Sequence, residues 1–236
     1  MILLFLYITN IQSNILQSKL YSDLSEDTYI NKIFTGVLPF SINNHIQLGL
    51  SNKIKQISGC RFTDLNISSR FFIIEVVNDS SIFDNIFERT THQSEKWGCI
   101  LYNYRSPNKF IIKNCKFIRI VGKGDEYSFS VFKSNIHTLA HIEFKFCEFI
   151  DCGEKGSNRP IVSILQQNST IEFYKCNFSY ENPPKSRVLE LKGNGATFDS
   201  CNFDNCGTNC IDIGIDHISS SFKGEFQFTN NFVISA

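Results

Sequence analysis

The 236-residue sequence has one tryptophan, one methionine and five prolines, and no net charge, because 23 Lys and Arg balance 23 Asp and Glu. A neutral chain has no field that draws it to nucleic acid or to an anionic membrane. Thirteen glycines and five prolines exclude collagen, and 42% hydrophobic against 19% charged residues excludes wholesale disorder. No apolar run approaches the roughly 20 residues of a spanning helix. We therefore expect a folded chain without a nucleic-acid partner or an integral membrane segment.

The N-terminus, MILLFLYITNIQS, contains an apolar run from Ile2 to Ile8 that is too short to span a bilayer. Two interpretations stay open for it: a short secretory signal cleaved near Ser13, or a buried N-terminal cap. Apolar residues recur at near-helical spacing over 8–24, which favours a capping helix there. Residues 1–52 are therefore assigned to a signal peptide, if one is present, and an N-terminal cap.

An internal repeat organises the rest of the chain. Four segments share a Cys-x-Phe motif: FIIKNCKFIRI, IEFKFCEFIDC, TIEFYKCNFSY and ATFDSCNFDNC, which start at Phe110, Ile142, Thr170 and Ala196. The template reaches upstream to Cys60 and Phe62. Two weaker copies are expected to place Ser81 and Phe83, and Asn230 and Phe232, at the Cys and Phe positions. The motif recurs about every 28 residues, with steps of 21 to 34, which is the range of solenoid repeats.

The spacing within each unit favours strands over helices. The pieces between turn signals are short and rich in Phe, Ile and Val, whereas a helical repeat needs two full helices. An apolar residue stands three before each Cys and a Phe two after it, so a single flat strand cannot turn all three side chains inward. We therefore expect a corner in the two residues before each Cys, such as Lys113 and Asn114.

Stacked coils place equivalent residues above one another, about 4.8 Å apart. The Phe residues after the Cys, Phe117, Phe149, Phe178 and Phe203, are then expected to form one interior ladder and the Cys residues a second. A further strand in each unit is predicted from the apolar blocks FSVF, VSIL and VLEL, at Phe129, Val162 and Val188. These blocks precede Asn135, Asn168 and Asn194, which we expect to form an Asn ladder at a bend.

The pattern predicts an all-β fold: a right-handed parallel β-helix of about seven coils over residues 53–236, with an N-terminal cap. The repeat units resemble those of right-handed parallel β-helix proteins of the pectin-lyase-like class. More narrowly, FDNC at Phe203 to Cys206 resembles repeats of polymorphic outer-membrane proteins and of surface β-helix proteins of anaerobic protists. The resemblance covers about residues 53–234 and implies a rigid rod with loops on one side.

The nine cysteines raise the question of a metal site. Cys201, Cys206 and Cys210 lie close together in sequence, with His217 seven residues further on. However, Cys201 belongs to the interior ladder, and Cys206 occupies a position that is apolar in other units. Core packing is therefore the favoured interpretation, and no metal ion or other cofactor is expected. The ladder does not decide whether the thiols are oxidised.

Catalytic motifs of the pectin-lyase-like class are not recognisable. NCIDIG at Asn209 to Gly214 has Thr208 and Asn209 where polygalacturonases carry carboxylates. GIDH, at Gly214 to His217, shares three residues with a pectate-lyase motif, but Gly replaces its Trp. Asp212 and Asp216 fit outward-facing, solvated positions on a strand as well as they fit a catalytic role. We expect no catalytic residue, although three or more carboxylates converging in a groove along one sheet, especially around Asp212 and Asp216, would favour an enzyme.

The remaining histidines, His45, His92, His137 and His141, have no carboxylate or thiol partner in a recurring pattern, so structural or surface roles are expected. Polar loops after the Phe strands begin at Gly122, Gly153 and Glu181 and differ from unit to unit. They are either tolerated insertions or a variable surface for a carbohydrate or protein ligand. Sequons begin at Asn66, Asn78, Asn168 and Asn177.

The leading functional hypothesis is a non-catalytic secreted or cell-surface binding module. The alternative is a divergent carbohydrate-active enzyme, a polysaccharide lyase or a glycosidase. The ligand and the oligomeric state do not follow from the sequence.

Overall fold

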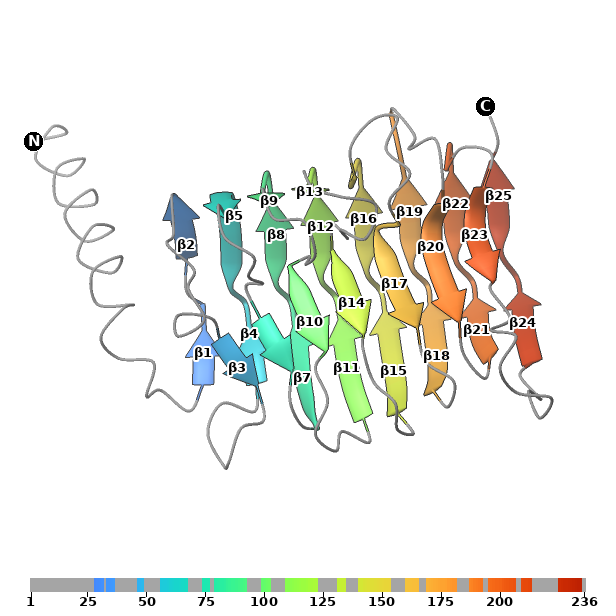
Figure 1. Cartoon of the computed structure of the whole chain (residues 1–236), viewed down its shortest axis with the longest axis horizontal. Helices are drawn as coiled ribbons and strands as arrows, with labels where there is room; N and C mark the ends of the chain where they lie inside the picture. Colours follow the sequence, from blue (N-terminus) through green and yellow to red (C-terminus); the bar gives the residue numbers. More distant parts are fainter. Residues whose placement is uncertain are drawn as a thin grey trace, which may run out of the picture.

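The described part of the chain is all-β in the computed structural model and forms a parallel β-solenoid (Figure 1). The structure describes residues 28–31, 33–36, 46–48, 56–67, 74–76, 79–92, 99–102, 109–122, 131–134, 140–153, 160–165, 169–181, 187–192, 195–206, 209–213 and 225–234. Within these segments there is no helix of the length and apolarity needed to cross a bilayer. The capping helix expected over 8–24 lies outside them.

Three parallel sheets run along the solenoid. Sheet 1 has eight strands in chain order: β1 (Thr28–Ile30), β4 (Gln56–Ser58), β7 (Ser80–Phe83), β11 (Lys109–Lys113), β15 (Ala140–Lys145), β18 (Ser169–Tyr174), β21 (Gly195–Asp199) and β24 (Glu225–Thr229). Sheet 1 contains the strands that lead into each Cys position, as the repeat predicts.

Sheet 2 contains the Cys-x-Phe strands and has ten members: β2 (Ile33–Gly36), β5 (Arg61–Ile67), β8 (Ile86–Glu88), β9 (Thr91–His92), β12 (Lys116–Ile118), β13 (Val121–Gly122), β16 (Glu148–Ile150), β19 (Asn177–Ser179), β22 (Asn202–Asp204) and β25 (Phe232–Ile234). Sheet 3 has seven: β3 (Ile46–Leu48), β6 (Ile74–Val76), β10 (Ile100–Tyr102), β14 (Phe132–Ser134), β17 (Val162–Leu165), β20 (Arg187–Lys192) and β23 (Asn209–Ile213). Strands β1, β2 and β3 pair with β4, β5 and β6, so solenoid strands begin upstream of residue 53.

A sharp corner joins each sheet 1 strand to the following sheet 2 strand. One residue at each corner has a positive φ of 50–62°: Asn31, Gly59, Asp84, Asn114, Phe146, Lys175, Ser200 and Asn230. Five of these are Asn, Asp or Gly, the residues that adopt the left-handed conformation at least cost. The corner expected before each Cys is therefore confirmed. It turns both the apolar residue before it and the Cys and Phe after it towards the interior.

The Phe ladder is confirmed and is longer than the sequence indicated. Seven rings form one continuous stack, in which each ring lies on the ring of the next coil at a centroid distance of 4.5–5.1 Å. The rings are those of Phe34, Phe62, Phe87, Phe117, Phe149, Phe178 and Phe203. A second stack, at the position three before Cys, contains Phe144, Phe173 and Phe198. Both stacks are buried and form the core.

The weak copy at residues 80–87 was aligned wrongly from the sequence. Asn85 and Phe87, not Ser81 and Phe83, occupy the Cys and Phe positions, because Phe87 stacks on Phe117 and is in register with it. The correction makes the steps between successive Phe positions 25 to 32 residues, more even than the expected 21 to 34. Phe83 lies instead on sheet 1 and is only half-buried.

The last copy is displaced by one residue from its expected alignment. Asn230 is the corner residue, Asn231 takes the Cys position, and Val233 pairs with Phe203 in place of Phe232. The Asn231 side chain accepts a hydrogen bond from the backbone N–H of Cys201, which fixes this register.

The apolar blocks form sheet 3 as predicted, but in a shifted register. Phe132, rather than Phe129, pairs with Val162, and Val162 pairs with Leu189, rather than Val188. Backbone pairing, rather than the first apolar residue of each block, sets the alignment. The Asn ladder expected at residues 135, 168 and 194 lies outside the described residues.

The Cys column has a hydrogen-bonding role in addition to packing. Four thiols, those of Cys115, Cys147, Cys176 and Cys201, donate to carbonyl oxygens of the preceding coil at 3.4–3.9 Å. Asn85 and Asn231 stand at the same position, and their amide groups donate to the equivalent carbonyls of Ile57 and Phe198 at 3.0 Å. The position therefore requires a small buried donor, and either Cys or Asn supplies it.

The buried thiols should resist modification in the native state. None of the nine cysteines, all of which the structure describes, is in a disulfide, and only Cys210 is partly exposed. Burial raises the pKa of Cys115 and Cys152 to about 12, so neither forms the reactive thiolate at neutral pH. Titration of the reduced protein with a chromogenic disulfide reagent should modify about one thiol per chain quickly, and all nine after denaturation. Rapid reaction of most thiols in the native protein would contradict the buried column.

Candidate functional site

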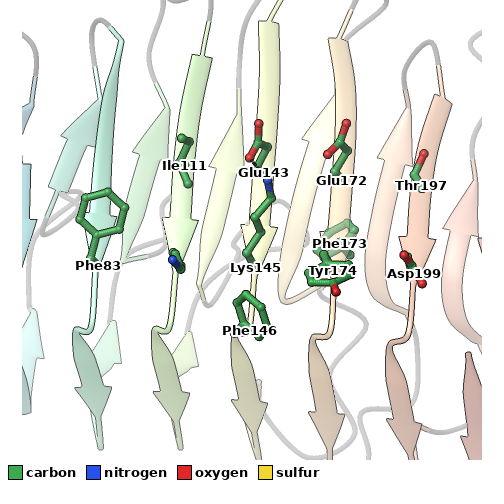
Figure 2. A pocket seen from close by; sticks show the side chains of 11 residues that line it. Phe83, Ile111, Glu143, Lys145, Phe146, Glu172, Phe173, Tyr174, Thr197 and Asp199 are labelled. Atoms are coloured by element: carbon green, nitrogen blue, oxygen red, sulfur yellow. Dashed lines mark ion pairs between the residues drawn. The ribbon is translucent and has the colours of Figure 1, made fainter.

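A groove of about 660 Å³ runs across the outer face of sheet 1, a size typical of ligand sites (Figure 2). Its walls come from five neighbouring strands, β7, β11, β15, β18 and β21. The lining side chains are Phe83, Ile111, Lys113, Glu143, Lys145, Phe146, Glu172, Phe173, Tyr174, Thr197 and Asp199. We call this surface the sheet 1 groove. Aromatic rings and charged groups lie side by side in it.

Strand alternation places the polar residues of β15 on the outer face of sheet 1, where Glu143 and Lys145 line the groove. Ile142 and Phe144 point into the core, where both are fully buried. The intervening residues, His141, Glu143 and Lys145, therefore point outward from the same strand. Stacking then brings Glu172 of β18 beside Glu143, because the two residues are paired in register. Figure 2 shows the Glu143 and Glu172 side chains next to each other.

Glu143 is the centre of a charge cluster. Its Oε2 contacts Lys145 Nζ at 2.5 Å, and its Oε1 contacts the Lys109 ammonium and His141 Nε2, the latter at 2.8 Å. These partners leave only 4% of the Glu143 side chain exposed. Burial opposes ionisation, but the hydrogen bonds from Lys109, Lys145 and His141 outweigh it and lower the Glu143 pKa to about 2. The hydrogen bond to Glu143 in turn raises the pKa of Lys109.

His141 links Glu143 to two residues of the next strand. Its Nδ1 lies 2.7 Å from the hydroxyl of Thr170, and its Nε2 lies 3.6 Å from Glu172 Oε1. His141 and Glu172 are partly exposed, so the open side of this triad faces solvent. One ligand atom from each of His141, Glu143 and Glu172 lies within 4.8 Å of the other two.

Phe146, the corner residue that follows β15, contributes an exposed aromatic ring at one side of the groove. It is 42% exposed, and its ring meets that of Tyr174 edge-on at a centroid distance of 5.3 Å. The ammonium of Lys175 lies 5.1 Å from the Tyr174 ring and 5.8 Å from the Phe146 ring. These distances are within the range of cation–π attraction, which orients both rings.

The backbone conformation of Phe146 is unusual for a bulky residue. It is the corner residue of its coil and has a φ of 56°, a conformation that costs roughly 1–3 kcal/mol for most non-glycine side chains. Lys175 shares it at the next corner, but the other six corners of this kind carry Asn, Asp, Gly or Ser, and Phe146 is the one aromatic residue among them. A strained, exposed aromatic residue at a position that suits small polar residues points to a role outside folding.

The other residues considered from the sequence do not form a site in the described segments. Cys201 and Cys206 are buried in the interior and Cys210 packs against the core, as the core-packing interpretation predicts. His217 and Asp216 lie outside the described residues, as do His45 and His137. Asp212 lies on β23, in register with Glu190 of β20 on sheet 3. The loops after Gly122, Gly153 and Glu181 are mostly outside the described residues.

No recurring pattern in the sequence marks a carboxylate partner for His141, but the structure gives it two individual ones. Glu143 is two residues away on the same strand face, and Glu172 is one repeat later. Both relations could have been found from the sequence: alternation along β15 gives the first. The distance from Cys147 to Cys176 gives the second, because the same offset applied to Glu143 leads to Glu172.

Comparison of the chain with models of known protein families, with curated proteins and with solved structures found no match to any of them. The function must therefore be inferred from the geometry of the sheet 1 groove.

Proposed function

We propose that the protein is a non-catalytic binding module and that the sheet 1 groove binds a carbohydrate. The observation that supports this most is Phe146, an exposed aromatic ring held in a strained corner beside Tyr174. An aromatic face packs against the apolar face of a sugar ring, and nearby polar groups can hydrogen-bond its hydroxyls. The groove offers both kinds of group next to each other.

The dimensions of the groove favour an extended ligand. It crosses five strands, and neighbouring strands lie about 4.8 Å apart, so it is about 19 Å long. A ligand that runs along the solenoid axis can contact Phe83 at one end and Thr197 or Asp199 at the other (Figure 2). An oligosaccharide chain uses this length, whereas a single sugar would leave most of it empty.

The charges in and beside the groove favour a neutral ligand. Glu143, Glu172 and Asp199 are opposed by Lys113 and Lys145 in the lining and by Lys109, which binds Glu143. No excess of one sign remains to attract a polyanion or a polycation. Charged groups of both signs can still hydrogen-bond hydroxyls, so a neutral glycan is the best match.

We further propose the finer features of the fold: a right-handed solenoid of about seven coils, with an N-terminal cap, similar to the pectin-lyase-like class. Sheets of seven to ten parallel strands support the number of coils. A secreted or cell-surface location is proposed with them, because glycan ligands are abundant outside cells and residues 1–13 fit a short signal.

A binding experiment with one substitution tests the proposed function. A printed array of neutral and acidic oligosaccharides should identify a ligand, and calorimetric titration should show that Phe146→Asn weakens its binding by at least about tenfold. Asn suits the left-handed corner, so the melting temperature of Phe146→Asn should equal or exceed that of the native protein. The control, Lys116→Gln, changes an exposed residue of sheet 2 and should leave binding unchanged. Equal affinities of the native protein and Phe146→Asn, or no glycan bound at all, would refute the proposal.

A divergent carbohydrate-active enzyme is the second candidate, because three carboxylates, Glu143, Glu172 and Asp199, line one groove. These three carboxylates lie on sheet 1, whereas Asp212, around which such a cluster was expected, lies on sheet 3. Glu143 is held ionised, with a pKa of about 2, and therefore cannot act as a general acid near neutral pH. Release of shorter oligosaccharides from the bound glycan, abolished by Glu172→Gln, would favour the enzyme over the binding module.

A further inference from the structure

We infer that His141, Glu143 and Glu172 form a binding site for a divalent transition metal ion such as Zn²⁺. The inference does not depend on the binding of a glycan. It rests on the positions of three ligand atoms, on the hydrogen bond that orients the imidazole, and on the burial of one carboxylate.

The spacing of the ligand atoms suits a small tetrahedral ion. Ligand atoms about 2.1 Å from tetrahedral zinc lie about 3.4 Å from one another. His141 Nε2 and Glu172 Oε1 are 3.6 Å apart, which needs almost no adjustment. His141 Nε2 and Glu143 Oε1 are 2.8 Å apart and must separate by about half an ångström. Small rotations of the partly exposed His141 and Glu172 side chains can provide this.

The backbone holds the three ligands without a loop. His141 and Glu143 alternate on β15, and Glu172 is paired with Glu143 on the neighbouring strand β18. Ligands on adjacent strands of a sheet are more rigidly placed than ligands on loops. Glu143, which is only 4% exposed, forms the inner wall of the site, and the open side faces solvent. Three protein ligands leave a fourth position for water or another ligand.

Thr170 orients the imidazole for metal binding. Its hydroxyl lies 2.7 Å from His141 Nδ1 and can either donate to Nδ1 or accept a hydrogen bond from Nδ1–H. Without an ion, Nε2–H donates to Glu143 and Nδ1 accepts from the Thr170 hydroxyl. When an ion binds, the ring proton moves to Nδ1 and Thr170 becomes its acceptor, so the Nε2 lone pair is free to bind the ion. A metal-bound histidine commonly donates its other ring N–H to such a partner.

Lys109 and Lys145 contact different carboxylate oxygens of Glu143. Lys109 contacts Oε1, the oxygen that the ion would take, whereas Lys145 contacts Oε2. Lys109 is 48% exposed, so its ammonium can move into water when the ion binds. Lys145 can remain on Oε2 and hold the carboxylate in place. Lys109 is therefore a competitor of the metal ion.

The ligand set selects the class of ion. An imidazole nitrogen and two carboxylates are typical zinc ligands, and similar sets bind cobalt and nickel. Calcium and magnesium prefer six or more oxygen ligands, which the triad does not supply. Zinc should therefore bind and calcium should not.

The test is calorimetric titration of the full chain with Zn²⁺, with Co²⁺ absorption spectra as a second readout of ligand geometry. We expect micromolar or tighter binding, weakened at least tenfold by His141→Ala and by Glu172→Gln, with Ca²⁺ giving no signal. Lys109→Gln should strengthen zinc binding several-fold, because it removes the competitor. The control, Lys113→Gln, removes a neighbouring positive charge that does not contact Glu143 and should change the affinity less.

Two results would overturn the inference. One is the absence of zinc binding in the native protein. The other is binding that persists in His141→Ala but is lost in Cys210→Ser, which would assign the metal to the partly exposed thiol. His141 and Glu172 are on the surface, so unchanged melting temperatures of the metal-free variants will show that they fold.

Discussion

Phe149→Ala is expected to reduce the free energy of unfolding by about 3–5 kcal/mol, the largest effect of any single change considered. Phe149 is completely buried, and its ring stacks between those of Phe117 and Phe178 at 5.1 and 4.7 Å. Removing it loses the burial of the ring and leaves a cavity in the middle of the ladder. The rings above and below are held by their own strands, so they cannot close the gap.

A matched control lies three residues earlier in the sequence. Phe146→Ala deletes the same side chain from an exposed corner and should cost less than about 1 kcal/mol, because only the edge contact with Tyr174 and the contact with Lys175 are lost. Denaturant titration of both variants gives the comparison. Similar midpoints for the two variants would show that Phe149 is not an interior residue.

Acid should destabilise the protein through Glu143, with an effect of up to about 3 kcal/mol between pH 5 and pH 2. The Glu143 pKa is lowered from 4.5 to about 2 in the folded protein. A lowered carboxyl pKa stabilises the folded state above pH 4.5, and this stabilisation is lost as the pH falls towards 2. Protonation removes the charge that holds Lys109, Lys145 and His141 around the carboxylate.

The measurement is the free energy of unfolding as a function of pH for the native protein and for Glu143→Gln. The Gln variant should be less stable at pH 7 and should lose less stability between pH 5 and pH 2. The control, Glu148→Gln, breaks the exposed pair with Lys116 and should lower stability by no more than about 1 kcal/mol. Parallel pH profiles for the native protein and Glu143→Gln would contradict the assigned role of this carboxylate.

The core of the fold could be predicted because the same residues recur at interior positions. Cys147, Cys176 and Cys201, each with a Phe two residues later, gave enough copies to establish the repeat and the corner before it. The weaker copies were misaligned because neither contains the Cys that marks the position, so Ser81 and Asn230 were assigned to it in place of Asn85 and Asn231. Asn85 and Asn231 take that position since a buried amide can donate to the same carbonyl as a thiol. The position requires a hydrogen-bond donor, and an alignment based on residue identity does not recognise that Cys and Asn both meet this requirement.

The candidate site was harder to predict because its residues do not recur. The outer face of sheet 1 differs from coil to coil, so His141 and Phe146 stand out only after the register is known. Glu172 is far from His141 in sequence and becomes its neighbour through stacking alone. Carboxylates close in sequence, such as Asp212 and Asp216, are visible without the register, whereas carboxylates one repeat apart are not.

The most direct test of the stacked arrangement is the anomalous scattering of sulfur in a crystal of the protein. In-register stacking predicts four sulfur positions in one line, from Cys115, Cys147, Cys176 and Cys201, separated by about 4.8 Å. Asn85 and Asn231 end this line, so the sulfur of Cys60 should follow only after a gap of one coil. Sulfur positions scattered through the molecule, or joined in disulfide pairs, would contradict the in-register stacking from which the groove and the metal site both follow.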